Sequence, residues 1–208
     1  SINALAQGMP EAARGNFCGI HFFNPPRYMA LVELIATGST RAATLDALEA
    51  WLTTRLGKSI VRAKDTPNFV ANRVGVMSIL AVMHHTERLG LGLDEVDALT
   101  GPLIGRPKSA TYRTADVVGL DTLAHVVGTM QATLPDDPWH RYFSTPEWLA
   151  ALISQGALGQ KTRGGIYRQD GKVINVLDLA TGEFRPSAGA VTPEVLAILK
   201  QSKPADKF

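Results

Sequence analysis

The fold of the N-terminal part of the chain is decided by the stretch Asn16-Phe17-Cys18-Gly19-Ile20-His21-Phe22-Phe23-Asn24-Pro25-Pro26. Nearly every residue up to Phe23 is apolar or aromatic, and the Asn-Pro-Pro sequence then ends the run. An uninterrupted apolar run of this length is typical of a strand buried on both faces, as in a parallel sheet. We therefore expect a buried strand over residues 17–23.

The residues that follow predict a strand, a helix and a further strand. Residues 31–35 are strand-like, a helix with apolar residues at helical spacing follows Ser39 or Thr40 as its cap and ends at Gly57, and residues 59–63 form the next strand. This alternation indicates the trailing portion of an α/β domain over residues 1–66. Because the chain opens on Ser1, within a helical pattern, we expect it to be part of a longer protein.

The pattern changes after residues 65–67, where periodic helical segments replace the strands. Helices are expected at 69–89, from 94 onward, and at 111–118, 120–130, 147–155 and 192–201. The one departure is 165–184, where an Asp170-Gly171 pair between β-prone runs predicts a hairpin. The sequence thus predicts an α+β chain, with a mainly helical domain over residues 67–208.

Composition excludes several classes of protein. At 45% hydrophobic and 19% charged residues the chain can bury a core, and its net charge of +2 forms no basic stripe, so nucleic acid is not an expected partner. A single cysteine, Cys18, excludes a disulfide framework and a multi-cysteine zinc site, and the adjacent His84 and His85 cannot face one metal from a helix. With no signal peptide and no apolar run long enough to span a membrane, we expect a cytoplasmic protein with no metal.

A histidine and a glutamate provide the candidate chemistry. His21 lies near the end of the first strand, and Glu33 lies twelve residues later in the centre of the next strand. Strands joined by a short connection can pair, so Glu33 could reach the imidazole, fix its tautomer and stabilise the imidazolium, as a general base requires. Taken alone, however, a histidine in an apolar strand is more often a hydrogen-bonded core residue.

Several ordered motifs resemble one enzyme family. They are His21-Phe22-Phe23-Asn24-Pro25, the segment 64–73 (Lys-Asp-Thr-Pro-Asn-Phe-Val-Ala-Asn-Arg), the segment 116–122 (Asp-Val-Val-Gly-Leu-Asp-Thr) and the segment 161–167 (Lys-Thr-Arg-Gly-Gly-Ile-Tyr). Together they resemble the L-3-hydroxyacyl-CoA dehydrogenases of fatty-acid β-oxidation. The resemblance implies a remnant of a Rossmann-like NAD-binding domain over 1–66, a helical substrate-binding and dimerisation domain over 67–208, and NAD-dependent oxidation of the 3-hydroxyl of an acyl-CoA.

The resemblance also implies a role for each matching residue. His21 takes the hydroxyl proton, Glu33 orients His21, and Asn72 hydrogen-bonds the substrate oxygen or helps to set the catalytic pocket. Asn24 positions substrate or cofactor, and Lys161 lies near the cofactor. Each of the last three has a structural alternative: a helix cap for Asn72, an Asn-Pro turn for Asn24 and a solvated loop lysine for Lys161.

Some positions depart from the family pattern. Arg163 stands where the family usually has glycine, and the run 164–167 (Gly-Gly-Ile-Tyr) replaces the usual Gly-x-Gly-Phe-Tyr. The segment Gly105-Arg106-Pro107-Lys108-Ser109 also departs from the family's usual Gly-Pro run. With the predicted hairpin, these features are similar to the long form that is fused to an enoyl-CoA hydratase. The implied partners are therefore the acyl-CoA substrate, a second copy in a homodimer, and a hydratase that is fused or in complex.

The sequence contains no Gly-x-Gly-x-x-Gly motif to hold the NAD pyrophosphate. We therefore expect this chain by itself to be inactive. The alternative is a non-catalytic substrate-binding and oligomerisation module of a larger multifunctional protein. A β-hydroxyacid dehydrogenase with a lysine base is disfavoured by the pairing of His21 with Glu33. The basic residues Arg106, Lys108 and Arg113 could meet a CoA phosphate or form a solvated face.

Overall fold

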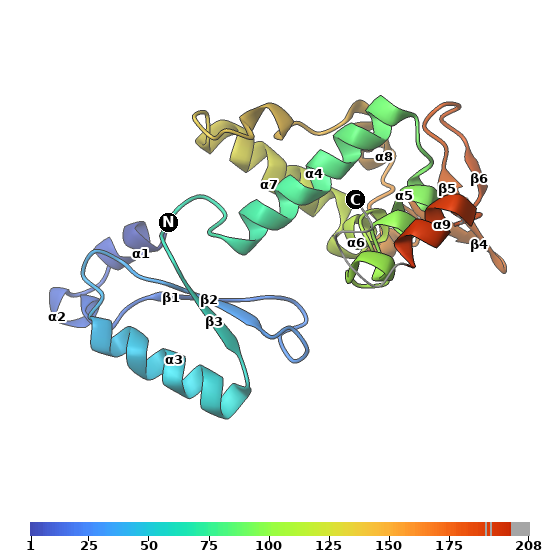
Figure 1. Cartoon of the computed structure of the whole chain (residues 1–208). Coiled ribbons are helices and arrows are strands. Elements are labelled where there is room, and N and C mark those ends of the chain that lie inside the picture. Colours follow the sequence, from blue (N-terminus) through green and yellow to red (C-terminus); the bar gives the residue numbers. More distant parts are fainter. Residues whose placement is uncertain (190, 192, 201–208) are drawn as a thin grey trace. The chain divides into compact units, whose positions relative to one another are not determined.

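The chain folds into two compact units, residues 1–74 and the residues from Gly75 onward (Figure 1). The structure, a computed structural model, describes residues 1–189, 191 and 193–200. Each unit has its own hydrophobic core and is described by itself.

The first unit is built on a small mixed sheet. Its strands are β1 (Gly19–Phe22), β2 (Leu31–Ile35) and β3 (Ser59–Ala63), in the order β1-β2-β3. Strand β1 runs antiparallel to β2, and β3 runs parallel to β2. Two short helices, α1 (Ile2–Gln7) and α2 (Glu11–Arg14), come before β1, and α3 (Ala42–Leu56) connects β2 to β3.

The core of this unit lies between the sheet and α3. Val32 and Leu34 of β2 are fully buried and cluster with Leu45 and Leu52 of α3. Figure 1 shows α3 running along one side of the three strands. The predicted strand–helix–strand order of residues 31–63 is therefore confirmed, as is the end of α3 at Gly57, which has a φ of +63°.

Two expectations for the first unit are wrong. Strand β1 is an antiparallel edge strand among the described residues, and Ile20 and Phe22 are 42% and 39% exposed, because alternate side chains of an edge strand point away from the packed face. Helix α3 begins after Arg41 without a side-chain cap. The Thr40 hydroxyl is used elsewhere, because it donates to the carbonyl of Phe17 at 2.6 Å.

The second unit is mainly helical. Helix α4 (Ala71–Leu89) enters it from the first unit and is followed by α5 (Leu93–Leu99), α6 (Tyr112–Val118), α7 (Leu120–Thr133), α8 (Glu147–Ser154) and α9 (Pro193–Leu199), with 3₁₀ turns η1 (Pro102–Ile104), η2 (His140–Tyr142) and η3 (Gln160–Thr162). The predicted helices are confirmed. The helix expected at 192–201 corresponds to α9, and its residues 192 and 201 lie outside the described residues. Helix α4 starts two residues later than expected because Asn68 and Phe69 adopt left-handed φ values of +60° and +51°.

The core of the second unit joins these helices to a hairpin. Its fully buried members include Met83 of α4, Leu93 of α5, Leu120, Leu123 and Met130 of α7, Phe143, and Leu149 of α8. Strands β4 (Tyr167–Asp170), β5 (Val173–Leu177) and β6 (Phe184–Pro186) form an antiparallel sheet, with the predicted Asp170-Gly171 turn between the first two. The predicted α+β class is confirmed. Among the described residues, no helix combines the length and apolarity needed to cross a membrane.

Asp116 of α6 joins the helices to the start of β4. Its buried carboxylate accepts hydrogen bonds from the backbone N–H groups of Ile166 and Tyr167, both at 2.9 Å. Burial raises the pKa of Asp116, against the lowering effect of these two bonds. The close approach of the backbone depends on Gly165, where an added Cβ would overlap Asp116 Oδ1 and lie 2.6 Å from the Cα of Gly159.

We expect Gly165→Ala to destabilise the second unit by about 1–3 kcal/mol or more, because the new methyl group meets backbone and a fixed carboxylate. The matched control is Gly128→Ala in α7, where nothing lies within 4 Å of the added Cβ. There alanine should stabilise the helix by up to about 1 kcal/mol. Thermal unfolding checks both variants, and equal shifts of Tm in the two would contradict this account of Gly165.

Candidate functional site

His21 and Glu33 face each other directly across the antiparallel strands β1 and β2. They are register partners, and His21 Nδ1 lies 2.8 Å from Glu33 Oε2. The Glu33 side chain is fully buried, whereas 31% of the His21 side chain is exposed. The prediction that Glu33 reaches the imidazole is therefore confirmed as a contact.

The second oxygen of Glu33 binds the start of α4. Glu33 Oε1 accepts hydrogen bonds from the backbone N–H groups of Val70 at 2.9 Å and Ala71 at 2.8 Å. These groups lie at the N-terminus of a nineteen-residue helix, where the helix dipole favours a negative charge. One buried carboxylate thus connects β2, β1 and the first turn of α4.

Two aromatic rings hold the imidazole in place. The ring of Phe23 lies 4.6 Å from the His21 ring, and the ring of Phe69 lies 5.5 Å from it, both tilted. Phe69 follows Asn68, and both have positive φ values, so the turn before α4 carries Phe69 to the histidine. The side-chain amide nitrogen of Asn68 is buried and has no hydrogen-bond partner among the described residues, which leaves both of its N–H donors unpaired.

The pair has the geometry of an oriented base. When Glu33 is ionised, its Oε2 can only accept, so the Nδ1 of His21 must carry the hydrogen. The neutral imidazole then has its lone pair on Nε2, which points away from the carboxylate and can accept a proton. A proton arriving at Nε2 creates an imidazolium that the adjacent carboxylate stabilises.

A buried lysine fixes the loop that follows His21. Lys58 is only 9% exposed, and its ammonium donates to the carbonyl oxygens of Pro26 at 2.5 Å and Met29 at 2.7 Å. The sequence does not reveal this role of Lys58, because a lysine between a helix-ending glycine and a strand is common. Its loop partners lie about thirty residues earlier in the chain, and no local signal connects them.

The remaining predicted site residues are distributed over both units. Asn72 is the second residue of α4, next to the Ala71 whose N–H reaches Glu33, and Asn24 is exposed in the loop after β1. Lys161 belongs to the second unit, in η3, and its ammonium pairs with the Asp121 carboxylate at 2.5 Å. The hydrogen bond from Lys161 lowers the pKa of Asp121.

Comparisons with known proteins agree on one family. Residues 1–66 match the family model described as 3-hydroxyacyl-CoA dehydrogenase, NAD binding domain, and residues 69–169 match 3-hydroxyacyl-CoA dehydrogenase, C-terminal domain. The chain is 40% identical over 203 residues to a probable 3-hydroxyacyl-CoA dehydrogenase of Bacillus subtilis (strain 168), covering 98% of this chain and 26% of that protein. The chain therefore spans about a quarter of the length of this relative.

A further relative and a solved structure add to this likeness. The chain is 32% identical over 187 residues to a putative fatty acid oxidation complex trifunctional enzyme of Rickettsia prowazekii (strain Madrid E), covering 86% of this chain and 26% of that protein. The fold is similar to the crystal structure of (S)-3-hydroxybutyryl-CoA dehydrogenase PaaH1 from Ralstonia eutropha, with a TM-score of 0.70 and 32% identity, covering 82% of this chain and 57% of that one.

We expect Lys58→Met to lower the free energy of unfolding of the first unit by about 2 kcal/mol, because two carbonyls lose a charged donor. Hydrogen exchange at the amides of Tyr28 and Met29, which bond to the carbonyl of Pro25, should become faster. The control is Lys64→Met, at an exposed lysine. Equal, small effects of the two substitutions would show that Lys58 does not hold the loop.

Proposed function

Because the chain belongs to the 3-hydroxyacyl-CoA dehydrogenase family, we propose that it supplies the acid–base part of an NAD-dependent oxidoreductase in fatty-acid oxidation. The whole protein converts an L-3-hydroxyacyl-CoA to a 3-ketoacyl-CoA. The observation that supports this most directly is the His21–Glu33 pair, in which a buried carboxylate holds one nitrogen of a partly exposed imidazole.

In this proposal His21 is the general base. Its Nε2 takes the proton from the substrate's 3-hydroxyl, and the electron pair of that O–H bond forms the second bond of the ketone. NAD, when bound, accepts the hydride that leaves the carbon bearing this hydroxyl. By accepting the hydrogen of Nδ1, Glu33 selects the tautomer of the neutral imidazole in which Nε2 carries the lone pair, and it stabilises the imidazolium that forms. Its two bonds to the start of α4 prevent the carboxylate from turning away.

The residues that the structure describes include no binding site for the NAD pyrophosphate. Dinucleotide-binding folds hold this group with a glycine-rich turn at a helix N-terminus, and the described residues contain no such strand–turn–helix. Residues 1–66 nevertheless match the NAD binding domain of the family. We therefore assign NAD to the whole protein, and to this chain the proton-transfer residues together with the individual cofactor contacts proposed below.

Three residues have proposed supporting roles. Asn72 hydrogen-bonds the substrate oxygen, a role supported by its position beside Ala71, whose N–H binds Glu33. Asn24 positions substrate or cofactor from the exposed loop after β1. Lys161 contacts the cofactor, and to do so it must share its ammonium with Asp121.

The proposed partners follow from the same family. We assign an acyl-CoA as substrate and a second copy as partner in a homodimer formed through the helical unit. An enoyl-CoA hydratase, fused or in complex, is the further proposed partner. The likeness to a protein named as a trifunctional enzyme supports this last assignment, because the region similar to this chain makes up 26% of that protein.

In the whole protein, we expect His21→Gln to lower kcat at least ~10²-fold with little change in KM, since a general base contributes about 10²–10⁴-fold. The matched control is His125→Gln, at an exposed histidine of α7, which should leave kcat unchanged. Formation of NADH from a medium-chain L-3-hydroxyacyl-CoA, followed by absorbance, measures both. A kcat for His21→Gln within about threefold of wild type would refute the base assignment.

A further inference from the structure

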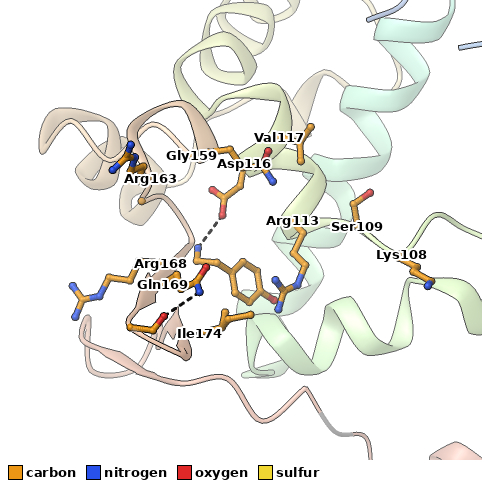
Figure 2. Close-up of a pocket in the computed structure, with 14 residues that line it drawn as sticks. Lys108, Ser109, Arg113, Asp116, Val117, Gly159, Arg163, Arg168, Gln169 and Ile174 are labelled. Atoms are coloured by element: carbon orange, nitrogen blue, oxygen red, sulfur yellow. Dashed lines mark hydrogen bonds between the residues drawn. The ribbon is translucent and has the colours of Figure 1, made fainter. Parts of the chain in front are cut away.

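The second unit contains an open cavity of about 790 Å³ whose lining includes none of the residues assigned to the proposed reaction (Figure 2). Its walls come from α6 and the residues before it, from the loop around η3, and from the hairpin β4–β5. All of the lining residues belong to this unit. The volume is in the range of pockets that bind small molecules of cofactor or drug size.

The lining of this cavity carries an excess of positive charge. Four cationic side chains line it, namely Lys108, Arg113, Arg163 and Arg168, against one carboxylate, Asp116. The Asp116 oxygens already accept the N–H groups of Ile166 and Tyr167. Asp170, at the end of β4, pairs with Arg168 at 3.2 Å. Two positive charges therefore remain uncompensated among these groups.

The donors of these cations are available to a ligand. Neither the guanidinium of Arg163 nor the ammonium of Lys108 bonds to another described residue, and both side chains are exposed. The guanidinium carbon of Arg113 lies over the Tyr167 ring, 4.0 Å from its centroid, and the guanidinium N–H groups donate no hydrogen bond to a described residue. Figure 2 shows Arg163 and Arg168 towards one side of the view and Arg113 and Lys108 towards the other.

Arg163 occupies its position at an energetic cost. Its φ is +59°, a left-handed conformation that costs an L-residue roughly 1–2 kcal/mol and that glycine adopts without strain. A glycine here would be the more stable choice for the turn after η3. The arginine is thus unexplained by the fold, whereas an unpaired guanidinium at the rim of a basic cavity is explained by an anionic ligand.

We propose that this cavity binds an organic phosphate monoester whose body is about the size of a nucleotide. A phosphate monoester carries close to two negative charges at neutral pH and three acceptor oxygens, which matches the two uncompensated cations and suits guanidinium groups. The exposed apolar side chains of Val117 and Ile174 provide surface for the uncharged body. Two sources have this chemistry: the 3′-phosphate end of a CoA molecule, and a free nucleotide. The inference does not depend on the proposed role of His21.

The test is calorimetric titration of the full chain with adenosine 3′,5′-bisphosphate, with adenosine as the uncharged comparison. We expect the bisphosphate to bind at least tenfold more tightly than adenosine, and Arg163→Gly to weaken binding of the bisphosphate at least tenfold. The same variant should keep or raise the Tm, because it relieves the left-handed strain, so that lost binding is not lost folding. The matched control is Arg141→Gln, which removes an exposed arginine that stacks on Tyr142 outside the cavity and should bind as wild type does.

Two further titrations distinguish the sources of the phosphate. Binding of CoA at least tenfold more tightly than dephospho-CoA identifies the 3′-phosphate of CoA as the ligand group. Binding of adenosine 5′-monophosphate without binding of CoA identifies a free nucleotide. The proposal is overturned if no phosphate probe binds at 1 mM, if adenosine binds as well as its bisphosphate, or if Arg163→Gly retains wild-type affinity.

Discussion

The buried carboxylate of Glu33 is the interaction on which the rest of the first unit depends. It accepts from the imidazole of His21 with one oxygen and from the backbone of Val70 and Ala71 with the other. A fully buried charge is costly unless it is paired and hydrogen-bonded, and removal of one partner typically costs several kcal/mol. The strand pairing, the turn at residues 68–69 and the start of α4 are therefore coupled to one side chain.

The same contact connects stability to the proposed chemistry. A base must present one nitrogen in one tautomer, and the backbone N–H groups at the start of α4 fix the carboxylate that selects this tautomer. Phe23 and Phe69 pack against the imidazole with tilted rings, and Lys58 fixes the loop beyond it. A substitution at any of these positions can change the reaction without touching a substrate, because it changes where Nε2 points.

Much of this arrangement could be predicted from the sequence, and the remainder could not. The strands at 31–35 and 59–63, the intervening helix and the Asp170-Gly171 turn follow from local patterns, and the distance between His21 and Glu33 follows from strand pairing. The direction of β1 does not, since a short apolar run does not specify its neighbour. The roles of Phe69 and Lys58, and the cavity around Arg163, depend on contacts between segments far apart in the chain.

The central claim, that Glu33 orients His21 as a base, is tested most directly by the nitrogen-15 NMR spectrum of the His21 ring. In the wild-type chain, at a pH where the imidazole is neutral, we predict a protonated Nδ1 and an unprotonated Nε2, because Nδ1 donates to the carboxylate 2.8 Å away. Unconstrained neutral histidine favours the opposite tautomer. A spectrum with the hydrogen on Nε2 would contradict the account.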